Sequence, residues 1–153
     1  MLKEIFTKLI GPTIVASGRA IKIFNLEVYS RYKFDITPEQ YLVLSMLKDD
    51  ENLSQNRLCK LLFKDKSNMT RLISILEEKG LIEKIQQTDN KKQANIIKIT
   101  EKGRLLRAKI APLEFETRKY YLKDISQDDM YTCIKVLTQI QKNIEKQEQN
   151  DKK

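Results

Sequence analysis

The chain has 153 residues, 41% of them apolar and 33% charged, which allows one domain with a modest core and much solvated helix surface. With 4 glycines and 3 prolines it has too few turn residues for an all-β fold or a glycine-rich nucleotide-binding loop. Lysine and arginine total 29 against 21 acidic residues, and this net charge of +8 favours a polyanionic partner or an acidic membrane surface.

The scarce residue types exclude several kinds of site. There is no histidine, so an imidazole base and a zinc–histidine site are absent. Two cysteines, Cys59 and Cys133, are too few for a disulfide framework and fit a reducing compartment. No apolar run approaches the ~18 residues of a membrane span, and residues 2–10 are too charged for a signal peptide core. We therefore expect a cytoplasmic protein with no metal, no cofactor and no catalytic residues.

Helix boundaries are clear in the first third of the chain. Apolar residues at helical spacing predict a short opening helix, which Gly11 and Pro12 interrupt before a longer helix over 13–32. The segment Thr37–Gln40 combines an N-cap, a first-turn proline and a capping-box glutamine, so another helix is predicted over 38–48.

Two helices joined by a tight turn follow. Ser54 is the predicted N-cap of the first, Asp65 is the N-cap of the second, and Gly80 ends the second. The period of the apolar residues then changes, which predicts two short strands at 81–86 and 95–99 around a polar, basic loop. The sequence thus predicts a helix-turn-helix unit followed by a β-hairpin.

The C-terminal third is predicted to form two long helices. Thr100 caps the first, which runs over 101–122 with a bend at Pro112, and Ser126 caps the second. Apolar residues of the last helix recur three and four apart, and such a narrow seam packs against another helix. We therefore predict helix pairing through Met130, Cys133, Leu137, Ile140 and Ile144.

Positive charge is concentrated in the helix-turn-helix unit and the hairpin. The span 57–71 holds five cations and one carboxylate, and the span 84–104 holds six cations and two carboxylates. A membrane binder would need an apolar stripe opposite these cations, and neither span has one. The pattern therefore favours double-stranded DNA, and no membrane, as the partner.

The polar residue types in these spans match groove and phosphate contacts. The helix after Asp65 would enter the major groove, while the start of the preceding helix offers amides and short side chains to a phosphate. Lysines at the hairpin tip could reach the adjacent minor groove or its backbone. The predicted DNA-binding residues are Ser54, Gln55, Asn56, Lys64, Lys66, Ser67, Asn68, Thr70, Arg71, Lys91 and Lys92.

Simpler structural interpretations stay open for the same residues. The basic spans could be solvated faces, and Ser67, Asn68 and Thr70 could serve only to start a helix. The two cysteines fall at apolar-periodic positions, which is typical of buried packing residues rather than redox sensors.

The ordered set of motifs resembles the MarR family of transcriptional regulators. Leu58–Leu72 follows the family pattern without gaps, Leu76–Ile82 matches the next block, and Ile99–Gly103 resembles the motif that closes the wing. The order of the flanking helices extends the similarity over about residues 12 to 146. The resemblance implies a mainly α fold with a small β-hairpin wing, namely a winged helix-turn-helix with N- and C-terminal dimerisation helices.

The resemblance also implies a domain plan and a set of partners. Residues 36–103 would form the winged helix-turn-helix, 1–35 and 104–147 the helical dimerisation region, and 148–153 a polar tail. Regulators of this family are homodimers that bind near-palindromic operators, most often as repressors. They often respond to small aromatic or anionic effectors bound between the dimer helices and the DNA-binding lobe.

Three features depart from the family pattern. Lys91 and Lys92 stand at the wing tip where Asp-Arg is usual, Phe63 replaces a small turn residue, and Cys59 stands where alanine is common. The alternative to DNA binding is a winged-helix module that binds protein through the same surfaces. An enzyme has no supporting motif.

Overall fold

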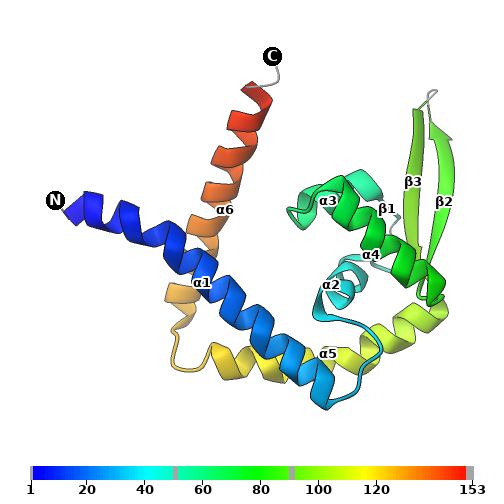
Figure 1. The fold of residues 1–153 in the computed structure, drawn as a ribbon, viewed down its shortest axis with the longest axis horizontal. Coiled ribbons are helices and arrows are strands. Elements are labelled where there is room, and N and C mark those ends of the chain that lie inside the picture. Colours follow the sequence, from blue (N-terminus) through cyan, green and yellow to red (C-terminus); the bar gives the residue numbers. More distant parts are fainter. Residues whose placement is uncertain (1, 50–51, 90–91, 151–153) are drawn as a thin grey trace. The chain divides into compact units, whose positions relative to one another are not determined.

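The chain is mainly helical with one small sheet (Figure 1). The computed structural model describes residues 2–49, 52–89 and 92–150. The chain divides into two compact units, Met1–Phe115 and Glu116–Lys153. In order, the elements are α1 (Leu2–Arg31), α2 (Pro38–Met46), β1 (Leu53–Ser54), α3 (Gln55–Leu61), α4 (Lys66–Glu78), β2 (Ile82–Asp89), β3 (Lys92–Ile99), α5 (Glu101–Tyr121) and α6 (Gln127–Asn150).

Side-chain caps fix the starts of the short helices. Thr37 Oγ1 accepts a hydrogen bond from the Gln40 amide at 3.2 Å, and Gln40 Oε1 accepts one from the Thr37 amide at 2.9 Å, which closes the capping box of α2. Ser54 and Asp65 each accept from the amide three residues later and so cap α3 and α4. The predicted starts of these three helices are confirmed, and α2 ends at Met46, just before its predicted end.

The N-terminal segment forms one helix rather than two. α1 runs through Pro12, so the predicted interruption at Gly11 and Pro12 is wrong. Proline removes one hydrogen bond, to the carbonyl of Lys8, and Gly11 and Pro12 are both exposed. Because water can satisfy a carbonyl at such a position, the helix continues past the proline.

The sheet has three strands, one more than the sequence predicts. β2 and β3 pair antiparallel along their whole length, with Asp89 opposite Lys92, so both strands extend into the segment predicted as a loop. β1 pairs with the other edge of β3, with Ser54 opposite Ile96, which gives the order β1-β3-β2. The hairpin is thereby joined to the residue that caps α3.

The hydrophobic core lies in the first unit, mainly in residues 36–103, which we call the lobe. The inward faces of α2, α3, α4 and the sheet form it, together with side chains from α1 and α5. The periodic apolar residues of α4 are buried there, as their spacing predicts. The fully buried side chains include Val43, Leu44, Leu47, Leu58, Met69, Ile73, Leu76, Ile82, Ile97 and Ile110.

One hydroxyl closes the base of the hairpin. Thr100 Oγ1 donates to the Gly80 carbonyl at 2.8 Å and accepts from the Gly103 amide at 3.1 Å. Gly80 has a φ of +67°, the left-handed conformation that ends α4 as predicted. Gly103 lies so close to Leu81, the residue before β2, that a Cβ there would overlap the Leu81 carbonyl oxygen. The two ends of the hairpin therefore meet at Thr100.

Candidate nucleic-acid interface

Helix α4 has two faces of opposite character. Its apolar residues, Met69 among them, pack into the core of the lobe. The other face gathers short hydrogen-bonding groups and long cations over the N-terminal half of the helix, the arrangement that reads base edges in a major groove. The exposed residues of this face are the predicted Lys66, Ser67, Asn68, Thr70 and Arg71.

The turn between α3 and α4 contains a left-handed residue. Phe63 has a φ of +48°, and its side chain is exposed. The Lys64 amide donates to the Cys59 carbonyl at 3.0 Å, which closes the turn. Phe63 thus adopts the backbone conformation that the small turn residue usual in the family pattern would take more easily.

The first residue of α3 is buried in the lobe. Gln55 is 7% exposed, and its Nε2 donates to Thr70 Oγ1 at 2.7 Å while its Oε1 accepts from Asn95 Nδ2 at 3.4 Å. Ser54 beside it is half-buried, and Asn56 is exposed. Gln55, one of the three DNA contacts predicted at this helix start, therefore has a side chain that is hydrogen-bonded to other residues of the protein.

Asn68 is bound to the cap of its own helix. Its backbone amide donates to Asp65 Oδ1 at 2.8 Å, and its side-chain Nδ2 donates to Asp65 Oδ2. The backbone hydrogen bond first, and then the side-chain one, lower the pKa of Asp65. The Asp65 carboxylate thus fixes the orientation of an exposed amide at the start of α4.

Lys64 has a carboxylate partner on α2. Its Nζ lies 3.7 Å from Glu39 Oε1, and Lys22 of α1 donates to the same oxygen at 3.2 Å. Partial burial opposes ionisation of Glu39, but the hydrogen bond from Lys22 and the charge of Lys64 outweigh it, so the pKa of Glu39 is lowered. Part of the Lys64 charge is therefore balanced inside the lobe.

The lysine side chains of the hairpin that the structure describes lie near its base. Lys84 Nζ lies 3.1 Å from Glu77 Oε2, which ties β2 to α4, and Lys98 is exposed on β3. Lys91 lies outside the described residues. Of Lys92 the structure describes the backbone alone, at the start of β3.

The predicted pairing residues of α6 are only partly buried in the described chain. The helix begins after its predicted N-cap, Ser126, and extends to Asn150, into the segment predicted as a polar tail. Neighbouring side chains such as Ile134 are exposed as well. Of the predicted pairing residues, Met130, Leu137 and Ile140 are half-buried, whereas Cys133 and Ile144 are exposed.

The two cysteines have different surroundings. Cys59 is half-buried against the core, and its burial first, and then the charge of Asp65, raise the pKa of its thiol. Cys133 is exposed, so the prediction of a buried packing residue is wrong for it. Its apolar periodicity belongs to the α6 seam rather than to the core of the lobe.

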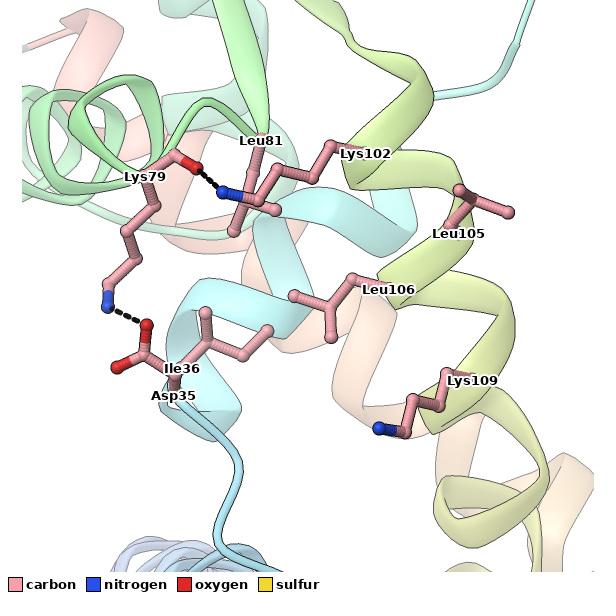
Figure 2. Close-up of a pocket in the computed structure, with 8 residues that line it drawn as sticks. All are labelled: Asp35, Ile36, Lys79, Leu81, Lys102, Leu105, Leu106 and Lys109. Atoms are coloured by element: carbon pink, nitrogen blue, oxygen red, sulfur yellow. Dashed lines mark hydrogen bonds and ion pairs between the residues drawn. The ribbon is translucent and has the colours of Figure 1, made fainter.

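A pocket of about 340 Å³ lies beside the end of α4 (Figure 2). Lys79 points toward Asp35, with 2.7 Å between Nζ and Oδ2, and Lys102 Nζ donates to the Lys79 carbonyl at 2.6 Å. The hydrogen bond from Lys79, followed by its charge, lowers the pKa of Asp35. Lys109 of α5 adds a further ammonium. The apolar part of the lining is formed by Ile36, Leu81, Leu105 and Leu106.

Two other kinds of site are absent from the part of the chain that the structure describes. Its acidic and cysteine side chains nowhere gather in threes as a metal site would need. Among the described helices, none combines the length and apolar character that crossing a bilayer requires.

Comparisons with known proteins agree with this architecture. Residues 36–94 match the MarR family. The chain is 27% identical over 112 residues to the uncharacterized HTH-type transcriptional regulator YybA of Bacillus subtilis, covering 73% of this chain and 74% of the relative. A MarR/EmrR family transcriptional regulator from Acinetobacter sp. ADP1 superposes with a TM-score of 0.79 at 20% identity, over 92% of this chain and 98% of that one. A MarR mutant from E. coli complexed with operator DNA superposes with a TM-score of 0.72 at 22% identity, over 88% and 96%.

The capped helix pair, the outward polar face of α4 and the hairpin together define a winged helix-turn-helix protein, which confirms the predicted fold class. Residues 36–94 thus match the MarR family, and the relative that the chain resembles over 112 residues is named as a transcriptional regulator.

Proposed function

We propose that the protein binds double-stranded DNA as a homodimer at a near-palindromic operator and represses transcription there. The observation that carries the proposal is the exposed polar and cationic face of α4 beside a basic hairpin. The E. coli MarR mutant adds support, because that protein has a similar fold and is complexed with operator DNA. Such a role would place the protein in the cytoplasm with the chromosome.

The proposed contacts divide by their chemistry. Arg71 and Lys66 have the length to reach guanine edges or phosphates, and Asn68 presents an amide that can pair with adenine. Lys91 and Lys92 are proposed to contact the adjacent minor groove or its backbone. Ser54, Asn56, Lys64, Ser67 and Thr70 complete the proposed interface, whereas the buried side chain of Gln55 is bonded to Thr70 and Asn95.

A salt titration tests the electrostatic part of the proposal. The logarithm of the affinity for duplex DNA should fall linearly with the logarithm of salt, by about 0.9 for each phosphate neutralised, with roughly 6 to 10 phosphates involved. Fluorescence anisotropy with labelled duplexes measures this slope. A flat response without a footprint would contradict DNA binding and favour the winged-helix protein-interaction module.

A single side chain tests the position of the interface. Arg71→Ala should weaken operator binding by about 1 to 3 kcal/mol, because it removes a cation that reads or clamps DNA. Arg31→Ala removes a cation from the exposed end of α1 and is the matched control. Equal affinities for the wild type and Arg71→Ala would remove Arg71 from the interface.

The operator itself can be found by selection. Fragments recovered from random duplex DNA at a stated salt concentration should contain an inverted repeat whose half-site centres are about 10 bp apart. A transcription reaction that carries this repeat in its promoter would then show repression. Recovered sites without symmetry would contradict the paired binding of two copies.

The homodimer is proposed from the apolar side chains that the single chain leaves uncovered. They include Ile134 and Ile144 on α6 and Phe6 and Leu9 on α1, each between 48% and 67% exposed. Apolar surface of this kind is typical of association surfaces. Light scattering at micromolar concentration should give twice the chain mass, and a stable monomer would contradict the proposal.

The pocket beside α4 supports the proposed small-molecule effector. A ligand with an apolar body and one anionic group would match its leucine wall and the ammonium groups of Lys102 and Lys109. Such a ligand should release the protein from DNA, and Lys109→Met should weaken that release without abolishing DNA binding. Anisotropy with a panel of small organic acids measures both effects.

A further inference from the structure

The polar residues around Gln55 form a directed chain of hydrogen bonds. Thr70 Oγ1 donates its proton to the Lys66 carbonyl at 2.8 Å, so it can only accept from Gln55 Nε2. That polarity leaves Gln55 Oε1 as the acceptor for Asn95 Nδ2. The chain therefore runs from strand β3 through the start of α3 to the first residue of α4, and we call it the Gln55 relay.

The sheet places the outer end of the relay on the inward face of the hairpin. Alternate residues of a strand share one face, so Asn95 lies on the same face of β3 as Ile97 and Ile99. Both isoleucines are buried in the core, whereas Asn95 is exposed. Asn95 is thus the point at which the inward face of β3 changes from apolar packing to a polar contact.

The inner end of the relay lies at the helix start that we propose to contact DNA. Lys66 is the first residue of α4, and its carbonyl receives the last hydrogen bond. A buried amide such as that of Gln55 stabilises the fold only while its partners remain in place, because an unsatisfied amide in the interior is costly. The relay therefore couples the position of β3 to that of α4.

We propose that Gln55 is a positioning residue, which sets the spacing between the DNA contacts of α4 and those of the hairpin through Thr70 and Asn95. This inference rests on the proposed DNA binding and replaces the prediction that Gln55 itself contacts DNA. The two elements must reach neighbouring grooves at the same time, so the affinity for a site that spans both depends on their spacing.

The first experiment uses the free protein and needs no DNA. Gln55→Met removes the amide but keeps the length and charge of the side chain. In two-dimensional amide NMR it should shift resonances in both β3 and the first turn of α4 and leave α2 unchanged. Shifts confined to α3 would overturn the relay. Asn95→Ala, which cuts only the link to the hairpin, provides a second variant if Gln55→Met fails to fold.

The second experiment measures affinity for two duplexes at one salt concentration. The long duplex carries the flank that the hairpin would contact, and the short duplex lacks it. Gln55→Met and Asn95→Ala should each weaken binding to the long duplex roughly 5- to 10-fold and change binding to the short duplex little. The double variant should bind no worse than either single variant, because both cut the same relay.

Two outcomes would overturn the proposal in different ways. If Gln55→Met lost the same affinity for both duplexes, and this loss added to that of Asn95→Ala, Gln55 would be a direct DNA contact. Failure of the wild type to bind either duplex would refute the proposed function, while the NMR result would still decide whether the relay exists. Gln127→Met makes the same chemical change at an exposed position of α6 and should leave both readings unchanged.

Discussion

The lobe and α6 contain the same types of apolar residue, but these side chains differ in how much of them is exposed. In the lobe, residues such as Leu44, Leu58 and Ile97 are fully buried by neighbours from the same chain. On α6, Tyr131 and Ile134 are 70% and 64% exposed. The lobe therefore contains a core that one chain completes, whereas α6 has exposed apolar side chains of the kind we propose to lie in a dimer interface. This contrast separates substitutions that should unfold the chain from those that should only separate two copies.

The largest effect is expected at the base of the hairpin. Gly103→Ala should destabilise the protein by about 2 to 3 kcal/mol, because the new Cβ would overlap the Leu81 carbonyl and the backbone would have to move. Gly18→Ala on α1 is the control, since its Cβ would meet open space and should stabilise the helix by about 0.5 to 1 kcal/mol. Thermal unfolding followed by circular dichroism measures both, and equal effects would contradict the close packing.

A smaller effect, on association rather than folding, is expected on α6. Ile144→Lys should leave the unfolding free energy within about 0.5 kcal/mol, because the side chain is exposed in the single chain. It should weaken the proposed dimerisation by roughly 10- to 100-fold, because a cation would enter the proposed apolar interface. Thr132→Lys introduces the same charge at another exposed position. Sedimentation at several concentrations would show the difference, and identical behaviour of both variants would place the interface elsewhere.

A still smaller effect on the stability of the first unit is expected at acidic pH. The pKa values of Asp65, Asp35 and Glu39 are all lowered in the folded chain. The unfolded chain then binds protons more tightly, so the stabilisation is complete above the ordinary values of 3.8 and 4.5. It is lost as the pH falls through the lower folded-state values. The effect is modest because these groups are screened by solvent.

The contribution of one carboxylate can be isolated. Asp65→Asn keeps an N-cap of comparable strength but removes the titrating group. Its unfolding temperature should therefore decline less steeply below about pH 4 than that of the wild type. Scanning calorimetry between about pH 3 and 6 compares the two slopes, and parallel curves would show that the Asp65 hydrogen bonds contribute no pH dependence.

The smallest expected effect is a difference in the rate at which the two thiols react. A thiol-specific reagent should modify the exposed Cys133 before Cys59, because burial raises the pKa of Cys59 and limits its access. If α6 lies in a dimer interface, the rate at Cys133 should also fall as the protein concentration rises. Mass spectrometry after brief labelling gives both rates, and faster modification of Cys59 would contradict the difference in exposure.

Local signals in the sequence predict most of the lobe. Thr37, Ser54 and Asp65 start their helices as predicted, because a cap and its partner lie within three residues of one another. Gly80 ends α4 because a left-handed residue suits glycine. The prediction of a helix break at Pro12 is wrong, because the exposure of this position, and not its residue type alone, decides whether the helix continues.

The candidate interface is less predictable because its partners are distant in the chain. Gln55 has the residue type of a DNA contact, but its side chain pairs with Thr70 and Asn95, which are 15 and 40 residues away. Lys64 is likewise paired with Glu39 across the lobe. No local pattern distinguishes an exposed polar residue at a helix start from one that tertiary packing buries. The register of β1 on β3 places Asn95 near the start of α3, where its side chain reaches Gln55.

The closure of the hairpin at Thr100 has a consequence for engineering the protein. Because the carbonyl of Gly80 and the amide of Gly103 are both bonded to that hydroxyl, the two ends of the hairpin are held close together. The outer part of the hairpin, beyond Asn95, can then be lengthened, shortened or exchanged with little strain on the core. The length of duplex that the protein can contact could thus be changed without changing the core. Hairpins grafted from relatives would be one way to change it.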